Sequence, residues 1–195
     1  MRLKTFFLLA ALVALHLVLV FAGFIAPYDP AAQDRDLPYA QPTELHFRDA
    51  AGWHLRPFVY ARTIAPYSYV EDTSRSFSVH MFVRASSYRL LGIFQTNWHL
   101  FGVAAPARIA LLGTDGFGRD EFSRVLYGGQ ISVAAGIAAT LIALLVGSIF
   151  GMLAGFFGDW ADESLMGTTE LFLSLPWLYF LLGMRAFLPL HVSAL

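Results

Sequence analysis

Two long runs of uncharged, mostly apolar residues limit what this chain can fold into. Thr5–Ala26 holds 22 residues without a charge, and Ile131–Phe157 holds 27. At 1.5 Å of rise per residue, helices of these lengths measure roughly 33 and 40 Å, whereas the apolar core of a bilayer is about 30 Å thick. We therefore expect each run to cross a membrane as a helix.

The composition agrees with a membrane protein. Of the 195 residues, 57% are hydrophobic and only 14% are charged, which is more apolar surface than a soluble domain of this size can bury. The net charge of −1 provides no basic field for nucleic acid, so nucleic acid is not an expected partner. The chain has no cysteine, which excludes disulfides and thiolate metal sites.

The first run has two interpretations, an uncleaved anchor or a secretory signal peptide. Its length exceeds the roughly 7–15 apolar residues of a signal peptide, and no clear cleavage site precedes a polar stretch, so we expect an anchor. Arg2 and Lys4 come before the run, and basic residues stay on the cytoplasmic side. We therefore expect a cytoplasmic N-terminus and an extracytoplasmic segment after the helix.

Small residues recur every fourth position along the second run. A stripe of this kind lets another helix approach closely, so we expect it to pack against protein. The packing stripe consists of Ala135, Ala139, Ala143, Gly147, Gly151 and Gly155.

A third, weaker apolar stretch runs over residues 164–187 and is interrupted by Pro176. Because packed membrane helices tolerate a proline kink, we expect it to be a third crossing. The chain then ends within apolar residues 188–195, which we interpret as truncation of a longer chain.

Between the first two runs the composition becomes polar. Residues 27–130 contain ten arginines and seven of the nine prolines. Polar and apolar residues alternate in 44–60 and 78–84, which favours short strands. Four histidines lie here without the close spacing of a zinc site, so we expect scattered surface roles for His46, His54, His80 and His99.

A charged, glycine-framed element, Gly113–Gly129, comes directly before the second run. We expect Thr114 or Asp115 to cap a short helix that ends at Gly128–Gly129. Phe122, Val125 and Leu126 would share its apolar side. The polar side would hold Arg119, Asp120, Ser123 and Arg124.

No enzymatic motif or cofactor site is evident. Gly113 and Gly118 have the spacing of a phosphate-binding loop, but Arg119–Asp120 stands where that loop needs lysine and then serine or threonine. We find neither a catalytic triad nor a paired-carboxylate site, and we expect no enzyme activity, no cofactor and no metal site.

The element reads G-T-D-x-x-G-R-D-x-x-S-R-x-x-Y-G, and it resembles the membrane subunits of bacterial ABC importers for oligopeptides, dipeptides and nickel. Residues 26–30 (APYDP), 155–162 (GFFGDWAD) and Leu175–Pro176 also match, in order. The resemblance covers roughly residues 1–30 and 111–176. The segment between these two stretches is longer than the usual outer loop of the family.

The resemblance implies an all-α, multi-pass membrane protein with a partial type I ABC permease fold. Three transmembrane helices and a small β-containing extracytoplasmic insert are expected. The domains would be an N-terminal helix (1–26), the insert (27–110) and the first part of the permease domain (111–195), with crossings at about 131–157 and 164–187. Family members have about six helices and dock on their ATPase through a loop with E-A-A and a glycine, which does not occur here.

By resemblance, the chain is a permease subunit in the bacterial inner membrane that forms part of a solute path. The partners would be a second permease subunit, cytoplasmic ATPase subunits, an extracytoplasmic solute-binding protein and the lipid bilayer. The motif would contribute to an outer gate or to docking of the binding protein. The motif residues are Gly113, Thr114, Asp115, Gly118, Arg119, Asp120, Ser123, Arg124, Tyr127 and Gly128.

Two alternatives remain open at this point. In the first, the chain is a membrane-anchored extracytoplasmic interaction domain. In the second, it is a nonfunctional permease fragment. For Arg119, Asp120 and Arg124 the alternative to a gate is an ion-pair network that holds the surface helix in place. The solute and the pore-lining residues do not follow from the sequence.

Overall fold

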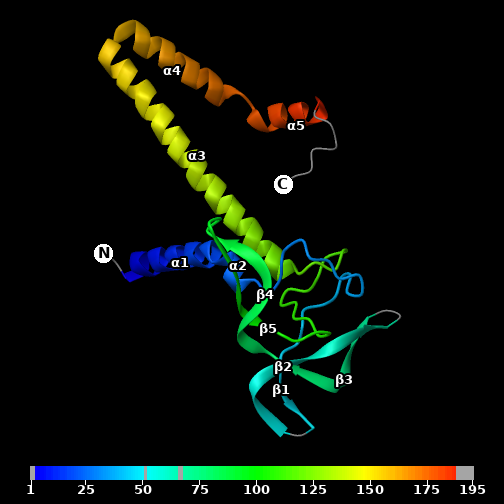
Figure 1. Ribbon diagram of the computed structural model, residues 1–195. Coiled ribbons are helices and arrows are strands. Elements are labelled where there is room, and N and C mark those ends of the chain that lie inside the picture. The colour runs from blue at the N-terminus through cyan, green and yellow to red at the C-terminus, as the bar shows by residue number, and fades with distance from the viewer. Residues whose placement is uncertain (1–2, 51, 66–67, 188–195) are drawn as a thin grey trace. The chain divides into compact units, whose positions relative to one another are not determined.

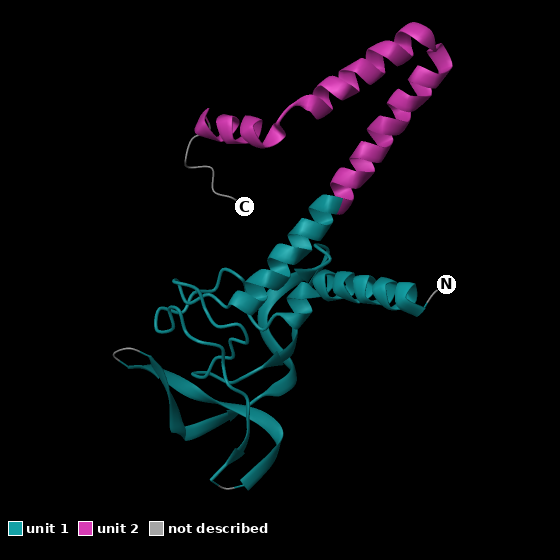
Figure 2. Ribbon diagram, turned by 180° about the vertical axis from the view of Figure 1, so that it is seen from behind, with its two compact units in different colours: residues 1–136 teal, residues 137–195 magenta. Residues whose placement is uncertain are grey.

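The computed structural model describes residues 3–50, 52–65 and 68–187; Arg2 and the apolar end 188–195 lie outside the described residues. The chain divides into two compact units, residues 1–136 and 137–195 (Figure 2). The helices are α1 (Leu3–Val20), α2 (Ala22–Ile25), α3 (Glu121–Phe157), α4 (Asp159–Ser174) and α5 (Trp177–Phe187). The strands are β1 (His46–Asp49), β2 (Gly52–Ile64), β3 (Tyr69–Ser78), β4 (His80–Leu90) and β5 (Phe94–Gly102) (Figure 1).

The expected all-α class is wrong, because five strands occupy most of the insert. Antiparallel pairing joins β1, β2 and β3 into one sheet, and β4 pairs with β5 in a separate ribbon. β2 alone has 13 residues, more than the short strands that the sequence suggested. The alternation of polar and apolar residues indicated strands, but the expectation of a small insert underestimated their length.

The core of the insert joins its two sheets to the loop that leads toward α3. Val59 of β2, Val79 between β3 and β4, and Ile109 of the loop are buried together. The Val79 amide donates to the Pro57 carbonyl at 2.8 Å, and the Ile109 amide donates to the Tyr28 hydroxyl at 2.9 Å. Tyr28, which follows α2, therefore holds the insert against the end of the first apolar run.

Among the described residues, α1 and α3 are long and apolar enough to cross a membrane. The expected third crossing is not one straight helix, because α4 and α5 are bent by 70° relative to each other. Pro176 lies at the break, and Leu175 before it has an extended backbone (φ −70°, ψ 132°). A proline disfavours helical conformation in the preceding residue, which explains the break.

α3 begins earlier than expected and continues through Gly128–Gly129, where the sequence suggested that a short helix ends. A Cβ at position 129 would lie 2.5 Å from Cδ2 of Leu19, so the glycine permits close approach to α1. Gln130 reinforces this contact, since its Nε2 donates to the Val20 carbonyl at 3.2 Å. Glycine serves here for packing inside a helix, whereas we had expected it to terminate one.

His99 is fully buried, which corrects the expected surface role. Its Nδ1 lies 2.5 Å from the Ala26 carbonyl oxygen and its Nε2 lies 2.8 Å from that of Ser86. Next to it, Tyr88 covers Gly23, where an added Cβ would come within 2.3 Å of the ring. The ribbon β4–β5 is thereby fixed to α2.

We expect His99→Ala to lower the free energy of unfolding of the insert by about 1–3 kcal/mol, because it removes the ring that contacts the buried Ala26 carbonyl and leaves a cavity. Tryptophan fluorescence during urea titration of the full chain in detergent measures the change. The control is His80→Ala, at an exposed position of β4. Equal midpoints for the two variants would show that the buried contacts of His99 do not stabilise the fold.

Candidate functional site

The charged element lies where the two stretches that carry the sequence resemblance meet. Leu126 of α3 is buried with Ala22 and Ala26 from the end of the first run. The Tyr28 amide also donates to the Ser123 hydroxyl at 3.4 Å, across a separation of 95 residues. The segment after the first helix and the segment before the second therefore form one structural region.

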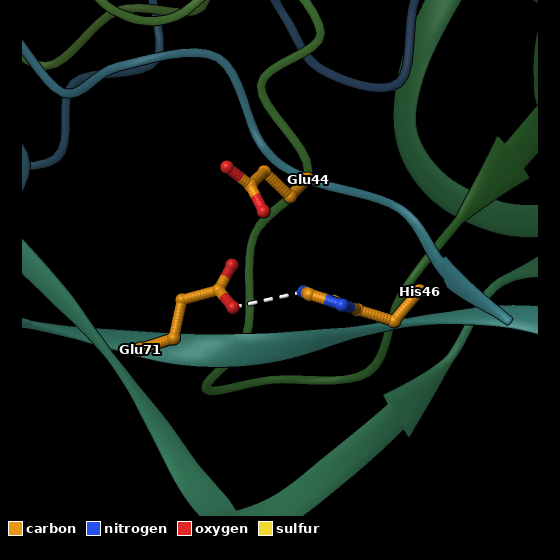
Figure 3. A group of neighbouring side chains, drawn as sticks. All are labelled: Glu44, His46 and Glu71. Carbon is orange, nitrogen blue, oxygen red and sulfur yellow. Dashed lines mark hydrogen bonds and ion pairs between the residues drawn. The ribbon is translucent and has the colours of Figure 1, made fainter. Parts of the chain in front are cut away.

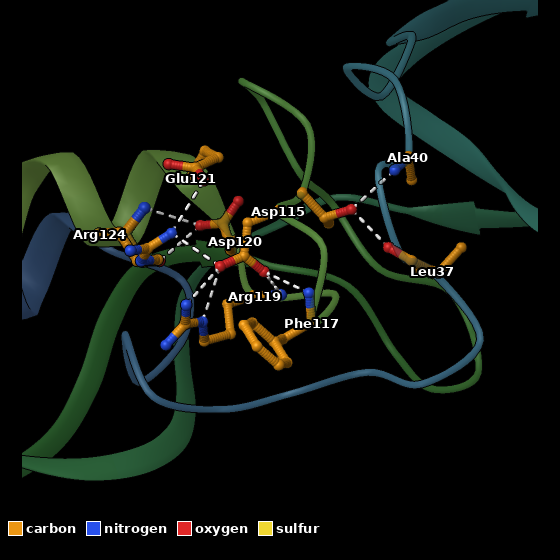
Figure 4. Close-up of polar contacts among 10 residues, drawn as sticks. Leu37, Ala40, Asp115, Phe117, Arg119, Asp120, Glu121 and Arg124 are labelled. Atoms are coloured by element: carbon orange, nitrogen blue, oxygen red, sulfur yellow. Dashed lines mark hydrogen bonds and ion pairs between the residues drawn. The ribbon is translucent and has the colours of Figure 1, made fainter.

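Asp115 organises this region (Figure 4). Its Oδ1 accepts hydrogen bonds from the amides of Phe117 and Arg119, both at 2.9 Å. Its Oδ2 accepts from Nε of Arg119 at 2.7 Å and from a guanidinium nitrogen of Arg124 at 2.8 Å. Arg124 also contacts Glu121 at 2.9 Å. One carboxylate thus fixes the loop and two arginines.

Burial of Asp115 disfavours its ionised form, but the hydrogen bonds from Arg119 and Phe117 and the charge of Arg119 outweigh burial. Together they lower the pKa of Asp115 to about 2. The carboxylate is therefore ionised throughout the physiological range, and the cluster of Asp115, Arg119, Arg124 and Glu121 has no net charge.

Asp120 caps α3, a role that the sequence assigned to Thr114 or Asp115. Its Oδ2 accepts from the Ser123 amide at 2.8 Å and from the Ser123 hydroxyl at 2.5 Å. Only 2% of Asp120 is exposed, and its Oδ1 has no hydrogen-bond partner among the described residues. Burial raises the pKa of Asp120, although the bonds from Ser123 oppose the shift.

Thr114 attaches the element to the segment after the first helix. Its hydroxyl donates to the Leu37 carbonyl at 2.5 Å and accepts from the Ala40 amide at 2.8 Å (Figure 4). Gly118 has a φ of 71°, and a Cβ there would lie 1.8 Å from the Asp34 carbonyl oxygen. Only glycine fits this backbone contact without rearrangement.

Not all motif residues gather in this cluster. Gly128 faces open space, and Tyr127 packs at the edge of the Leu126 cluster. The expected apolar side is also corrected, since Val125 is 58% exposed whereas Ser123 is buried.

Sequence reasoning missed a second ion pair in the region, in which Arg108 contacts Asp34 at 3.0 Å. The guanidinium of Arg108 also lies 4.4 Å from the centre of the Tyr28 ring. The motif that contains Tyr28 was recognised from its likeness to the family, but no local pattern pointed to its contact with Arg108.

Within the part of the chain that the structure describes, no neighbouring side chain meets the glycines of the packing stripe on α3. A Cβ added at Gly147, Gly151 or Gly155 would have nothing within 4 Å, apart from its own helix. Ala135, Ala139 and Ala143 are exposed as well. The stripe is therefore available to lipid or to another chain.

One group in the insert has the donor atoms of a cation site. Glu44, His46 and Glu71 offer ligand atoms within 4.8 Å of one another (Figure 3). However, His46 already contacts Glu71 at 2.8 Å, and Arg62 lies opposite Glu71 on β2. Burial lowers the pKa of Arg62, and the charges of Glu71 and Glu44 oppose that shift. One oxygen of Glu71 is thus already in contact with His46, and the charge of Arg62 acts on both carboxylates.

Part of the chain is similar to curated transport proteins. It is 41% identical over 71 residues to the glutathione transport system permease protein of Pectobacterium atrosepticum. The matched residues make up 36% of this chain and 24% of that protein. It is 44% identical over 78 residues to a peptidoglycan transport system permease protein of Agrobacterium fabrum, covering 40% and 20%. A probable D,D-dipeptide transport system permease protein of Escherichia coli is 41% identical over 81 residues, covering 42% and 27%.

The chain thus spans about a quarter of the length of these relatives. No family model matches the chain. No solved structure matches it either. The relatives confirm the resemblance to permease subunits of peptide-class importers and, with the two candidate spans, indicate a membrane protein.

We expect Asp115→Asn to destabilise the chain at neutral pH and to flatten its response to acid. The folded pKa of about 2 lies below the ordinary value of 3.8. The ionised group therefore contributes stability above pH 4 that is lost as the pH falls toward 2. Urea midpoints measured across this interval test the expectation. Asp36→Asn, at an exposed position, is the control. If Asp115→Asn lost stability in acid as steeply as the unchanged chain, the role assigned to the Asp115 carboxylate would be wrong.

Two motif glycines should respond differently to alanine. Gly118→Ala places a Cβ against the Asp34 carbonyl at positive φ, so we expect a loss of about 1–3 kcal/mol in unfolding free energy. Gly128→Ala faces open space inside α3 and should be neutral, or stabilising by up to ~1 kcal/mol. Thermal unfolding in detergent compares the two variants. Similar losses in both would refute the steric argument.

Proposed function

We propose that this chain acts as a permease subunit of a peptide-class ABC import system and forms part of the solute path. The observation that carries the proposal is its 35–44% identity to permease proteins of several transport systems. The candidate spans α1 and α3 support a location in the bacterial inner membrane. The activity we assign is transport driven by ATPase subunits, with no catalysis by this chain.

We propose that the N-terminus is cytoplasmic, which places the insert on the outside. Lys4 precedes the apolar run of α1, and long outer segments are translocated largely regardless of their own charge. The charged element follows the insert and packs against the end of α1, which supports its location at the same outer boundary. The residues from 111 onward would begin the permease domain, after the anchor 1–26 and the insert 27–110.

We assign the charged element to the outer mouth of the path. Arg119 and Arg124 keep 27% and 36% of their side chains exposed while Asp115 holds them in place. Exposed guanidinium groups in fixed positions suit docking of a solute-binding protein through carboxylates. The ion-pair network and the docking role are compatible, because the network positions the groups that would dock.

The packing stripe would contact the second permease subunit. Without a partner, Gly147 and Gly151 expose backbone to lipid and gain nothing from their small size. A helix from a second subunit would use this space for close packing. The assembly would also include two cytoplasmic ATPase subunits and an extracytoplasmic binding protein.

The absence of cysteine allows a direct test of the stripe. We expect a single Gly147→Cys to react with a membrane-permeant maleimide severalfold more slowly when a second permease subunit and ATPase subunits of a peptide-class system are co-expressed. Ile149→Cys is the matched control, because two residues turn a helix by about 200°. Mass spectrometry of inner membranes quantifies labelling, and affinity purification should recover the partners.

Equal labelling of both cysteines, together with purification as a monomer, would contradict the proposed role. That result would favour a membrane-anchored interaction domain whose helices serve only as an anchor.

A further inference from the structure

The ribbon β4–β5 has one apolar face, which is turned toward α2 and the end of α1. Tyr88 and Leu90 of β4 occupy alternate positions, and so do Phe94, Thr96, Trp98 and Leu100 of β5. Opposite them are Leu17, Val18, Phe21, Phe24 and Ile25. Between the two surfaces lies a groove of about 640 Å³ that is open to the outside and almost entirely apolar. Grooves of this size hold ligands in other proteins.

The tip of the ribbon is apolar and exposed. Leu91, Ile93 and Phe94 are 53%, 75% and 64% exposed. Leu91 and Gly92 have φ of 54° and 73°, so the turn requires left-handed conformations at both positions. Tight hairpin turns in water favour Asn-Gly or Asp-Gly there. Leu91 stands where such a turn favours Asn or Asp, and it adds to the exposed apolar surface of the tip.

Contacts at the base of the ribbon fix its height along α1. His99 contacts the Ala26 carbonyl, and Tyr88 covers Gly23. From this base the ribbon extends to its tip near the end of α1 (Figure 1). Leu90 and Phe94 line the groove together with Leu17 and Val18. Leu17 and Val18 belong to the last turn of a candidate membrane span. The tip therefore lies at the level of the C-terminal turn of α1.

Polar and aromatic groups border the apolar tip as they do at a membrane interface. Arg89 is exposed one residue before Leu90. The guanidinium of Arg84 lies 4.8 Å from the centre of the Trp98 ring. Tryptophan and tyrosine prefer the headgroup level, and arginine reaches from there to lipid phosphates. Charge and apolar surface together identify a phospholipid layer as the partner.

We propose that residues 90–94 insert into the leaflet where α1 leaves the bilayer, and that the groove holds a phospholipid acyl chain. Arg84 and Arg89 then contact the phosphates. The ribbon is a second, shallow membrane anchor, fixed to the first helix through His99 and Tyr88. The proposal does not depend on transport, since it requires only the described contacts and a membrane around α1.

Site-specific fluorescence tests the proposal on the full chain, which has no native cysteine. Ile93→Cys is labelled with an environment-sensitive dye and reconstituted in vesicles of phosphatidylcholine and phosphatidylglycerol that carry nitroxide lipids. We expect quenching to be strongest with a nitroxide near the headgroup, because interfacial elements reach roughly 5–10 Å into the boundary. Val13→Cys, within α1, should be quenched most by a deep nitroxide.

Leu55→Cys is the matched control, since Leu55 is an exposed apolar residue of β2 outside the groove. It should show little quenching by either lipid. Quenching of Ile93→Cys no stronger than that of Leu55→Cys would overturn the proposal. Blue-shifted emission of Ile93→Cys without quenching would also overturn it, because protein would then cover the tip. Loss of co-purification with ATPases would refute the proposed function and leave the membrane contact intact.

Discussion

Two neighbouring carboxylates with different surroundings hold the start of α3. Asp115 meets two arginines and stays ionised, with its pKa lowered to about 2. Asp120 is buried, caps the helix through Ser123, and has its pKa raised by burial. The loop cannot keep its shape without the first, and the helix cannot begin at Glu121 without the second. The contact between the two apolar runs depends on both.

This arrangement explains how a large insert can separate two segments that act together. Tyr28 contacts both the Ile109 amide and Ser123, so the chain returns to its starting point after the five strands. The three-stranded sheet packs around Val59 and Val79, whereas the ribbon β4–β5 also contacts α2 through Tyr88 and α3 through Phe101. Within the insert, the sheet β1–β3 is therefore the part that can change while the ribbon and the two ends remain fixed.

The sequence predicted features that depend on local pattern and missed those that depend on distant contacts. Charge-free runs indicated α1 and α3, and alternation indicated strands. Gly128–Gly129 was interpreted as a helix end because its packing partner Leu19 lies more than a hundred residues away. Asp115 and Asp120 are both plausible caps by residue type, and only the position at which α3 begins separates them. The burial of His99 depends on carbonyl groups at Ala26 and Ser86, which no spacing reveals.

The contact between Tyr28 and Ser123 has a consequence for biogenesis. Ribosomes add about 5–20 residues per second, so roughly 5–20 s pass between synthesis of these two residues. During that time α1 is already made, and the ribbon β4–β5 becomes available to Gly23 and Ala26 before α3 is synthesised. Chaperones or insertion machinery can therefore act on the nascent insert during this interval, before the contact between Tyr28 and Ser123 forms.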